Sequence, residues 1–370
     1  MFLFWSFLLT VQFLPGLLAM PANNCQSLIF NISTTASNDR FGNAFEPTNI
    51  TSILDFLNNL LRTGQNPVTG SFQASGTFQV AAEYCQPVNK REGDIALQLL
   101  VHGSTYDKTV WNGLDSSSTY SWTVTATEQG YATLAVDVIG HGLSSKPDPN
   151  TLAQLPLEAA VLHQIISKIR SQNSPLQRTY QKIVFVGHSF GSATGAILAR
   201  FFPDDVDALV LTGFSSQIPF PSPLLNLSME PAAQCFPRFE YLPTGYLTAS
   251  SRRGRIETFY GGNFDPGLAA LDYLKQGLIT VGEAASMGSA FQQTIPYPGK
   301  VLITTGDHDI LFCNAQFGHC LNILQRTKIL FPNSTAFSTL VAPDAGHTFM
   351  LHRSGPATIA KIHNWLNDQV

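Results

Sequence analysis

The sequence predicts an α/β fold in which helices flank a mostly parallel central sheet. Short runs of β-branched and aromatic residues, such as 182–186 and 300–305, alternate with segments of helical periodicity. That alternation is typical of repeated βαβ units. Small and polar residues follow directly after several of these runs. In a parallel sheet the chemistry lies at the carboxyl ends of the strands, so we expect these residues to share one edge.

The composition fits a large globular chain without a nucleic-acid partner. A chain of 370 residues can bury a large core. Its net charge is −4, only 12% of its residues are charged, and it contains no basic run. The five cysteines include no C-x-x-C, and their spacing with histidine matches no zinc site. We therefore expect no metal and no organic cofactor. Nothing in the pattern indicates an oligomeric state.

The first 19 residues are expected to be a secretory signal peptide. Residues 1–38 contain no Asp, Glu, Lys or Arg, and the run from Phe2 to Met20 is almost entirely apolar. A helix-breaking Pro-Gly pair interrupts this run, and small residues stand at Ala19 and Ala22. Because no Lys or Arg precedes the run, an uncleaved membrane anchor is the alternative. The interruption favours cleavage, and so a secreted protein with no stable membrane insertion.

Sequons and cysteines support passage through an oxidising secretory compartment. The chain has four N-x-S/T sequons, which are Asn31, Asn49, Asn226 and Asn333. An odd number of cysteines leaves one thiol over, and the connectivity stays open. Cys313 and Cys320 would close a short loop, and Cys25 and Cys85 would tie down the N-terminal arm.

The expected organisation is a core in two parts, with an N-terminal extension and an insertion. Residues 20–74 are polar and form the extension, with one helix predicted over Ile50–Leu61. The first core part is 75–213, and the alternation at 71–85 predicts edge strands. Its further strands are predicted over 95–101, 131–137, 182–186 and 208–213, and its helices over 120–129, 155–169 and from Ser192 onward.

The rhythm of strands and helices breaks over 214–298, which is rich in prolines and aromatics. Helical pieces are predicted there over 268–276 and 281–291. An insertion of this size between two sheet strands is expected to cover the site as a cap, or lid. The second core part, 299–370, is predicted to contain strands over 300–305 and 336–342 and a closing helix over 357–367.

Gly187-His188-Ser189-Phe190-Gly191 stands between a predicted buried strand and a predicted helix. A G-x-S-x-G turn in that context is so sharp that its central residue adopts a strained backbone conformation. Gly187 and Gly191 relieve the clash between strand and helix. The turn holds the hydroxyl above the sheet, where the helix N-terminus favours negative charge. We expect Ser189 to be a nucleophile, with Gly187 and Gly191 forming its elbow.

A serine hydroxyl is a poor nucleophile until a base takes its proton. Nine histidines compete for this role. His347 is the best placed, because it lies in a glycine-marked loop after the last predicted strand. His188 neighbours the serine, but its side chain is expected to point elsewhere along the turn. His352 lies too far along the chain and is expected to be structural.

The base in turn needs an acid that orients it. Asp309 lies four positions into the turn after the strand at 300–305, which lets its side chain reach inward. Asp307 is expected to organise that turn instead, and Asp137 to hold a loop on the far side of the serine. The chain order Ser189, Asp309, His347 is the one expected for a strand–turn–helix nucleophile.

These motifs together resemble the α/β-hydrolase superfamily, over roughly residues 75–370 apart from the variable cap. They comprise H-G at 102–103, D-x-x-G-x-G-x-S from 137, the nucleophile elbow, G-x-x-D at 306–309 and G-H at 346–347. The resemblance implies an oxyanion hole made by the backbone N–H groups of Ser104 and Phe190, worth about 3–4 kcal/mol for each donor. With its leader and sequons, the chain is most similar to secreted fungal hydrolases.

Departures from relatives narrow the expected reaction. Haloalkane dehalogenases and epoxide hydrolases of this fold carry aspartate where Ser189 stands, so neither of these activities is expected. The H-G-G-P-G of proline iminopeptidases and the H-G-G-G of one lipase group are absent, and H-G-S-T at 102–105 takes their place. The leading hypothesis is a secreted serine hydrolase that cleaves small-molecule carboxylic esters through an acyl-enzyme. A lactone, thioester or amide substrate, acyl transfer, and a non-catalytic binding module are the alternatives.

Overall fold

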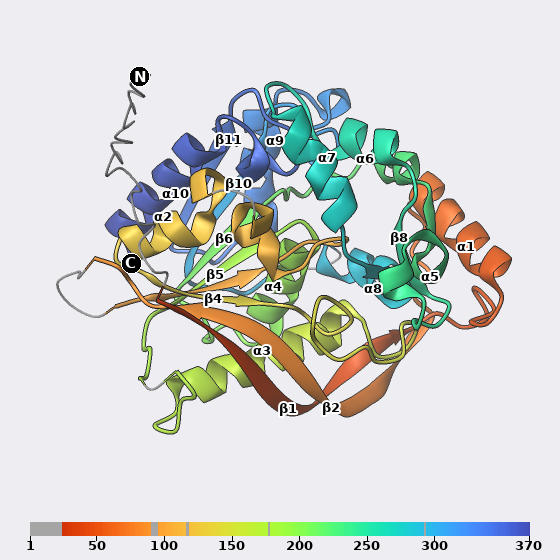
Figure 1. The fold of residues 1–370 in the computed structure, drawn as a ribbon, viewed down its shortest axis with the longest axis horizontal. Coiled ribbons are helices and arrows are strands. Elements are labelled where there is room, and N and C mark those ends of the chain that lie inside the picture. Colours follow the sequence, from red (N-terminus) through yellow and green to blue (C-terminus); the bar gives the residue numbers. More distant parts are fainter. Residues whose placement is uncertain (1–23, 90–94, 116–117, 177, 292–293) are drawn as a thin grey trace, which may run out of the picture.

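The computed structural model describes residues 24–89, 95–115, 118–176, 178–291 and 294–370 (Figure 1). The expected signal peptide at 1–19 lies outside these residues. Eight strands form one sheet in the order β1-β2-β4-β3-β5-β6-β10-β11. They are β1 (Cys25–Arg40), β2 (Gly70–Cys85), β3 (Leu97–Val101), β4 (Ala132–Val136), β5 (Ile183–His188), β6 (Ala208–Thr212), β10 (Lys300–Gly306) and β11 (Ala336–Ala342).

The six strands from β4 to β11 are parallel, and only β1 and β2 run antiparallel to their neighbours. Strands β3 to β6 are buried along their whole length. Strands that are covered on both faces carry apolar residues at successive positions, which is why they appear in the sequence as continuous apolar runs. The structure confirms the predicted mostly parallel sheet flanked by helices.

Helices cover both faces of this sheet (Figure 1). Helices α3 (Leu155–Arg170) and α4 (Phe190–Phe201) pack on one face, where Phe185 of β5 joins their apolar cluster. Helices α2 (Trp122–Glu128) and α10 (Gly355–Gln369) pack on the other, with Val184 and Val186. Helix α9 (Cys320–Arg326) contacts β11. The alternation of side chains along β5 thus supplies both layers.

The N-terminal segment contains a strand that the sequence analysis did not predict. Strand β1 pairs with β2 along its full length, from Cys25 opposite Cys85 to Arg40 opposite Gly70. It is the edge of the main sheet, so this part of the expected extension is built into the core. Phe30 and Ile32 are buried, whereas Asn31, Ser33, Thr35 and Ser37 on the opposite face are polar and exposed. Because only one face of β1 is buried, the strand is not apparent from the sequence of this polar segment.

The two cysteine pairings that were left open are both present. Disulfides join Cys25 to Cys85 and Cys313 to Cys320, and Cys235 is free. Cys25–Cys85 links the paired ends of β1 and β2, because these two residues lie directly opposite each other.

Helix α1 (Ile50–Thr63) lies in the connection between β1 and β2. The side chain of Asn49 caps its first turn by accepting from the Ser52 N–H, and Gly64 ends it with φ 64°. Only Gly and a few polar residues adopt that left-handed conformation readily. The helix is amphipathic, and its buried side contacts segment 214–298.

Segment 214–298 connects β6 to β10 and is not purely helical. It holds helices α5 (Ala232–Cys235), α6 (Arg252–Phe259), α7 (Pro266–Lys275) and α8 (Val281–Ser286). It also holds a small antiparallel sheet of β7 (Met229–Pro231), β8 (Tyr246–Ala249) and β9 (Ile279–Thr280). Helix α7 agrees with the predicted 268–276, whereas strands this short give no sequence signal. Together with α1 these elements occupy one end of the molecule (Figure 1).

A buried polar cluster fastens α8 of this segment to the core. His141 Nε2 lies 2.6 Å from Glu283 Oε1, and Glu158 of α3 accepts from the Thr194 hydroxyl at 3.2 Å. Burial raises the pKa of Glu283 to about 7. Burial and the nearby charge of Glu283 raise the pKa of Glu158 well above its usual range. Glu158 therefore prefers its protonated, neutral form in the folded protein, whereas Glu283, with a pKa of about 7, is partly ionised at neutral pH.

We expect replacement of Glu158 by glutamine to change how stability depends on pH. A carboxyl whose pKa is raised by folding stabilises the protein at low pH, and this contribution is lost as pH rises above the unfolded value of about 4.5. The loss is up to about 1.4 kcal/mol per pH unit, and a neutral amide does not suffer it. The melting temperature of Glu158→Gln, relative to wild type, should therefore increase from pH 5 to pH 8.

The matched control is Glu240→Gln, because Glu240 is exposed. Melting curves of wild type, Glu158→Gln and Glu240→Gln are compared from pH 5 to pH 8. A difference between Glu158→Gln and wild type that does not change with pH would contradict the assignment of a neutral buried carboxyl.

Candidate active site

Ser189 lies at the turn between β5 and α4 in a conformation that few non-glycine residues adopt, with φ 54° and ψ −114°. A Cβ on Gly187 would lie 2.6 Å from the carbonyl oxygen of Gly191. One on Gly191 would lie 2.2 Å from the carbonyl oxygen of Val101 in β3. The two glycines therefore allow strand, turn and helix to approach this closely. The Ser189 N–H donates to the Thr212 carbonyl at 2.8 Å, which fixes the turn against the end of β6.

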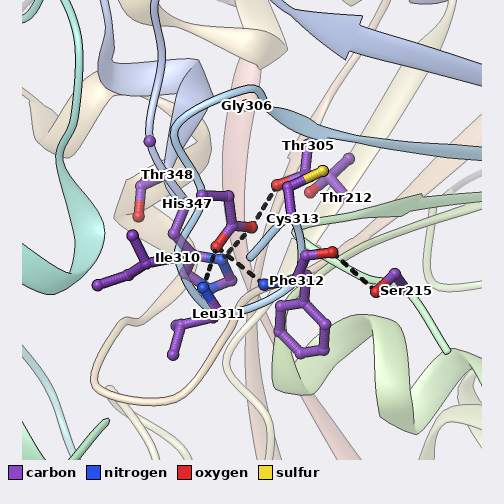
Figure 2. A network of polar contacts seen from close by, with 12 residues as sticks. Thr212, Ser215, Thr305, Gly306, Ile310, Leu311, Phe312, Cys313, His347 and Thr348 are labelled. Carbon is purple, nitrogen blue, oxygen red and sulfur yellow. Dashed lines mark hydrogen bonds and ion pairs between the residues drawn. The ribbon is translucent and has the colours of Figure 1, made fainter. Parts of the chain in front are cut away.

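Asp309 follows β10 and is completely buried, with both carboxylate oxygens engaged. Its partners His347, Thr305, Leu311 and Phe312 are labelled in Figure 2. Its Oδ2 lies 3.0 Å from His347 Nδ1 and accepts from the Thr305 hydroxyl at 2.5 Å. Its Oδ1 accepts from the backbone N–H groups of Leu311 and Phe312, at 2.8 and 3.1 Å. These four donors hold the carboxylate in a single orientation toward the imidazole.

The electrostatics of Asp309 favour its ionised form. Burial raises the pKa of this carboxyl, but the charge of His347 and the hydrogen bonds from His347, Thr305 and Leu311 outweigh it, and the pKa lies below its ordinary value. An ionised carboxylate only accepts hydrogen bonds, so His347 must present its proton at Nδ1. The Nε2 atom of the neutral ring is then free to accept a proton.

Ser189, His347 and Asp309 meet at the carboxyl ends of neighbouring strands. They follow β5, β11 and β10, and these strands lie within four adjacent positions of the sheet. Gly213 lies between the Ser189 turn and His347. It directly follows Thr212, whose carbonyl accepts from the Ser189 N–H. A Cβ on Gly213 would lie 2.8 Å from His347 Cε1. Asp309 and His347 are thus in direct contact, and Ser189 stands at the same edge of the sheet.

The two expected oxyanion donors face the same cavity as Ser189. The Phe190 N–H belongs to the first turn of α4, where backbone donors have no partner within the helix. Across the described ranges, the Ser104 N–H donates to no protein acceptor. The loop after β3 passes directly against the serine, because a Cβ on Gly103 would lie 3.0 Å from Ser189 Cβ. Two residues with free backbone N–H groups therefore line the cavity together with Ser189.

His188 was expected to point away from the site, but its side chain lies close to the proposed base. Its ring lies 4.9 Å from that of His347, centre to centre. Its Nδ1 lies 3.1 Å from the Thr212 hydroxyl, which itself donates to the Gly187 carbonyl. Nδ1 therefore carries the proton. Burial and the neighbouring His347 lower the pKa of His188 well below its usual value, so this ring stays neutral.

The residues that were expected to be structural have structural contacts. His352 Nε2 accepts from the Gly346 N–H at 3.0 Å, and Asp307 accepts from the Ala345 N–H at 3.2 Å. Asp137 pairs with Lys108 at 2.7 Å. The first two contacts shape the loop that presents His347.

A cavity of about 270 Å³ opens beside Ser189 and is mostly apolar. Its wall combines side chains from α1, from segment 214–298 and from the loop after β10. These include Leu57, Leu60, Leu61, Ile218, Phe220, Leu224, Met229, Phe259, Met287, Phe291, Leu311 and Phe312. The helix predicted over 50–61 is present, but nothing in the sequence indicated that it forms a wall of this cavity. The periodic leucines at 57, 60 and 61 were the available signal.

In the part of the chain that the structure describes, one group of potential metal-ligand side chains lies close together. It comprises Cys25, Glu83 and Cys85. Its two cysteines are joined to each other in a disulfide. They therefore offer no thiolate for a metal.

Comparisons with known proteins identify the family of this chain. The model of the alpha/beta hydrolase family matches residues 98–362, and the chain belongs to this family. The structure is similar to a thermophilic esterase from Thermogutta terrifontis, with a TM-score of 0.51, 18% identity, and coverage of 79% of this chain and 94% of that one. It is also similar to a monoacylglycerol lipase from Paleococcus ferrophilus, with a TM-score of 0.52, 15% identity, and coverage of 78% and 98%.

The similarity to curated relatives is local. A serine hydrolase-like protein of Homo sapiens is 26% identical over 98 residues, which are 26% of this chain and 44% of that protein. Its counterpart in Mus musculus is 30% identical over 98 residues, or 26% of this chain and 29% of that one. The matched region therefore spans less than half the length of these relatives.

Among the described residues, no helix is both long and apolar enough to cross a membrane.

Proposed function

We propose that this protein is a secreted serine hydrolase that cleaves carboxylic esters with an apolar acyl group through an acyl-enzyme. The observation that carries the proposal is the strained Ser189 beside the His347–Asp309 pair, at the wall of an apolar cavity. A nucleophile, a base and an orienting acid are the parts that acyl transfer needs. They stand at the edge of the sheet where this fold places its chemistry.

In the proposed reaction, His347 Nε2 takes the proton of the Ser189 hydroxyl as Oγ attacks the ester carbonyl. The N–H groups of Ser104 and Phe190 stabilise the negative oxygen of the tetrahedral intermediate. As the intermediate collapses, the protonated His347 gives its proton to the leaving alcohol. A water molecule then attacks the acyl-enzyme with His347 again as the base, which releases the acid and restores Ser189. Asp309 stays ionised throughout and stabilises the transient imidazolium.

The cavity supports an apolar acyl group of limited size. Ligand pockets commonly hold about 300–1,000 Å³, so a cavity of about 270 Å³ is small. Its wall offers few polar groups beyond the oxyanion donors. We propose that segment 214–298 is a cap, since residues from Ile218 to Phe291 close the cavity over Ser189. Helix α1, from the N-terminal segment 20–74, completes it.

The test of the function is a panel of p-nitrophenyl esters from acetate to palmitate, assayed with the full secreted protein. We expect turnover that rises from acetate to medium acyl chains and falls for longer ones. Thioesters, lactones, anilides and an added alcohol acceptor, compared at equal acyl length, test the alternative reactions that use the same machinery. A folded protein that turns over no acyl substrate would overturn the proposal and favour a non-catalytic binding module.

We expect Phe220→Ala to weaken selectivity for apolar acyl chains. Phe220 lines the cavity and is 45% exposed, so its ring forms part of the wall without being essential to the core. Losing its contact with an acyl chain should lower kcat/KM for medium-chain esters about 5- to 50-fold and leave acetate nearly unchanged. Phe201→Ala is the matched control, because Phe201 is 61% exposed and lies on α4 outside the cavity wall. Equal effects on acetate and on medium chains would contradict this assignment.

Secretion and glycosylation are part of the proposal. All four sequon asparagines, Asn31, Asn49, Asn226 and Asn333, are exposed. The two disulfides fit an oxidising compartment. The leader and sequons support the similarity to secreted fungal hydrolases, with retention by an uncleaved N-terminal anchor as the alternative. N-terminal sequencing and enzymatic deglycosylation of the protein from culture medium test these points.

A further inference from the structure

A buried ion pair from segment 214–298 reaches the loop that carries one of the oxyanion donors. Arg255 of α6 and Asp272 of α7 are both fully buried. They form a two-pronged pair, with Arg255 Nε donating to Asp272 Oδ2 and Nη2 donating to Oδ1, each at 3.0 Å. Burial lowers the pKa of Arg255, but the charge of Asp272 outweighs it, and the pKa lies above its ordinary value. The guanidinium therefore stays charged away from water.

The remaining arm of this guanidinium binds Thr105, the residue after Ser104. Arg255 Nη1 donates to the Thr105 hydroxyl at 2.7 Å. Thr105 is fully buried with φ 59°, a conformation that is strained for a β-branched residue. Its N–H donates to the Leu278 carbonyl at 2.6 Å, and its carbonyl accepts from the Gly277 N–H at 2.8 Å. Segment 214–298 therefore binds both the backbone and the side chain of Thr105.

The same ion pair also reaches the loop of the base through Tyr106. Tyr106 donates from its hydroxyl to Asp272 Oδ2 at 3.2 Å and accepts from Thr348, the residue after His347, at 3.1 Å. The guanidinium carbon lies 4.8 Å from the centre of the Tyr106 ring and 4.9 Å from that of Phe259. The Phe259 ring in turn lies 5.4 Å from that of His347. One buried charge pair therefore contacts neighbours of both the oxyanion donor and the base.

We infer that Arg255 and Asp272 are positioning residues that hold Thr105 in its strained conformation, and thereby aim the Ser104 N–H at the developing oxyanion. This inference rests on the proposed ester hydrolysis. The physical reason is that a strained residue keeps its conformation only when its surroundings determine it. Oxyanion donors act only at close range, so a displacement of about 1 Å is enough to lose much of their effect. Arg255 itself touches neither substrate nor the reacting atoms.

The kinetic test compares Arg255→Met and Arg255→Lys with wild type on the best ester of the panel. We expect Arg255→Met to lower kcat about 10- to 100-fold with KM changed less than about threefold, because the oxyanion forms only in the transition state. The inhibition constant of a boronic acid, which mimics the tetrahedral intermediate, should rise by a similar factor. Arg255→Lys keeps the charge and should recover part of kcat. Arg253→Met is the control, since Arg253 lies on the same helix and is 87% exposed.

Hydrogen exchange gives a reading that does not depend on catalysis. The amides of peptide 102–106 should exchange faster in Arg255→Met than in wild type and Arg253→Met, while peptides of β5 and α4 stay unchanged. Where Arg255→Met does not fold, Thr105→Val replaces the hydroxyl that accepts from Nη1 by a methyl group and carries the same expectations.

The outcomes separate the two proposals. A folded wild type that turns over no acyl substrate refutes ester hydrolysis, and the exchange data then decide alone whether Arg255 holds the loop. An active wild type whose folded Arg255→Met and Thr105→Val variants keep kcat, boronate affinity and the exchange of 102–106 overturns the positioning role. A loss of kcat that only follows the folded fraction, with unchanged boronate affinity per folded molecule, overturns it equally.

Discussion

Replacing Ser189 by alanine will lower kcat for the best ester about a millionfold and leave the protein folded. In serine hydrolases whose triad acts as a unit, removing the nucleophile costs on the order of 10⁶ in kcat. The fold should survive, because the Ser189 side chain makes no cap to α4 and the N–H that binds Thr212 is kept. Steady-state and single-turnover assays of the purified variant measure the loss.

The control for this variant is Ser171→Ala, an exposed serine at the end of α3. It should turn over esters at the wild-type rate. Residual turnover by Ser189→Ala above about 1% of wild type would contradict a covalent acyl-serine, after contaminating esterases have been excluded by a second purification.

Replacing Asp309 by asparagine will lower kcat about 10⁴-fold, although only one atom changes type. The two oxygens of Asp309 are not equivalent. Oδ1 accepts from the N–H groups of Leu311 and Phe312, so the amide oxygen of an asparagine must take that position. The amide NH₂ then faces His347 Nδ1, where Oδ2 accepted a hydrogen bond before.

In Asp309→Asn, this orientation of the amide gives His347 the wrong tautomer. With an N–H donor opposite Nδ1, the neutral His347 ring carries its proton on Nε2 and cannot accept one from Ser189. Asp307→Asn is the matched control two residues earlier, where the carboxylate is 37% exposed and binds the Ala345 N–H. We expect it to change kcat less than about fivefold. Comparable losses in both variants would show that the effect comes from the shape of the turn and not from His347.

The parts of this protein that the sequence predicted are those set by local pattern. Buried parallel strands appear as apolar runs, and Gly187 and Gly191 mark the turn because no other residue fits there. Ser189, Asp309 and His347 were selected because each follows a predicted strand, and the structure joins Asp309 to His347 and places Ser189 at the same edge of the sheet.

The missed features depend on partners that are far apart in the chain. Strand β1 is mostly polar on its outer face, so its place at the sheet edge follows only from its pairing with β2. The cavity wall combines α1 with segment 214–298, and periodicity cannot show which helix faces which. Arg255 and Asp272 match no motif, since their importance arises from the contact with Thr105. His188 was misplaced because the side-chain direction at a strained turn is not set by spacing.

The most direct test of the central claim is covalent labelling of the folded wild-type protein with a fluorophosphonate, followed by intact mass and peptide mapping. The account predicts one adduct per chain on Ser189, lost in Ser189→Ala, and formed much more slowly in His347→Ala because the hydroxyl then lacks its base. Labelled protein should lose ester turnover in proportion to the adduct. Folded wild type that forms no adduct, or forms it at another residue while turnover persists, would contradict the assignment of Ser189 as the nucleophile.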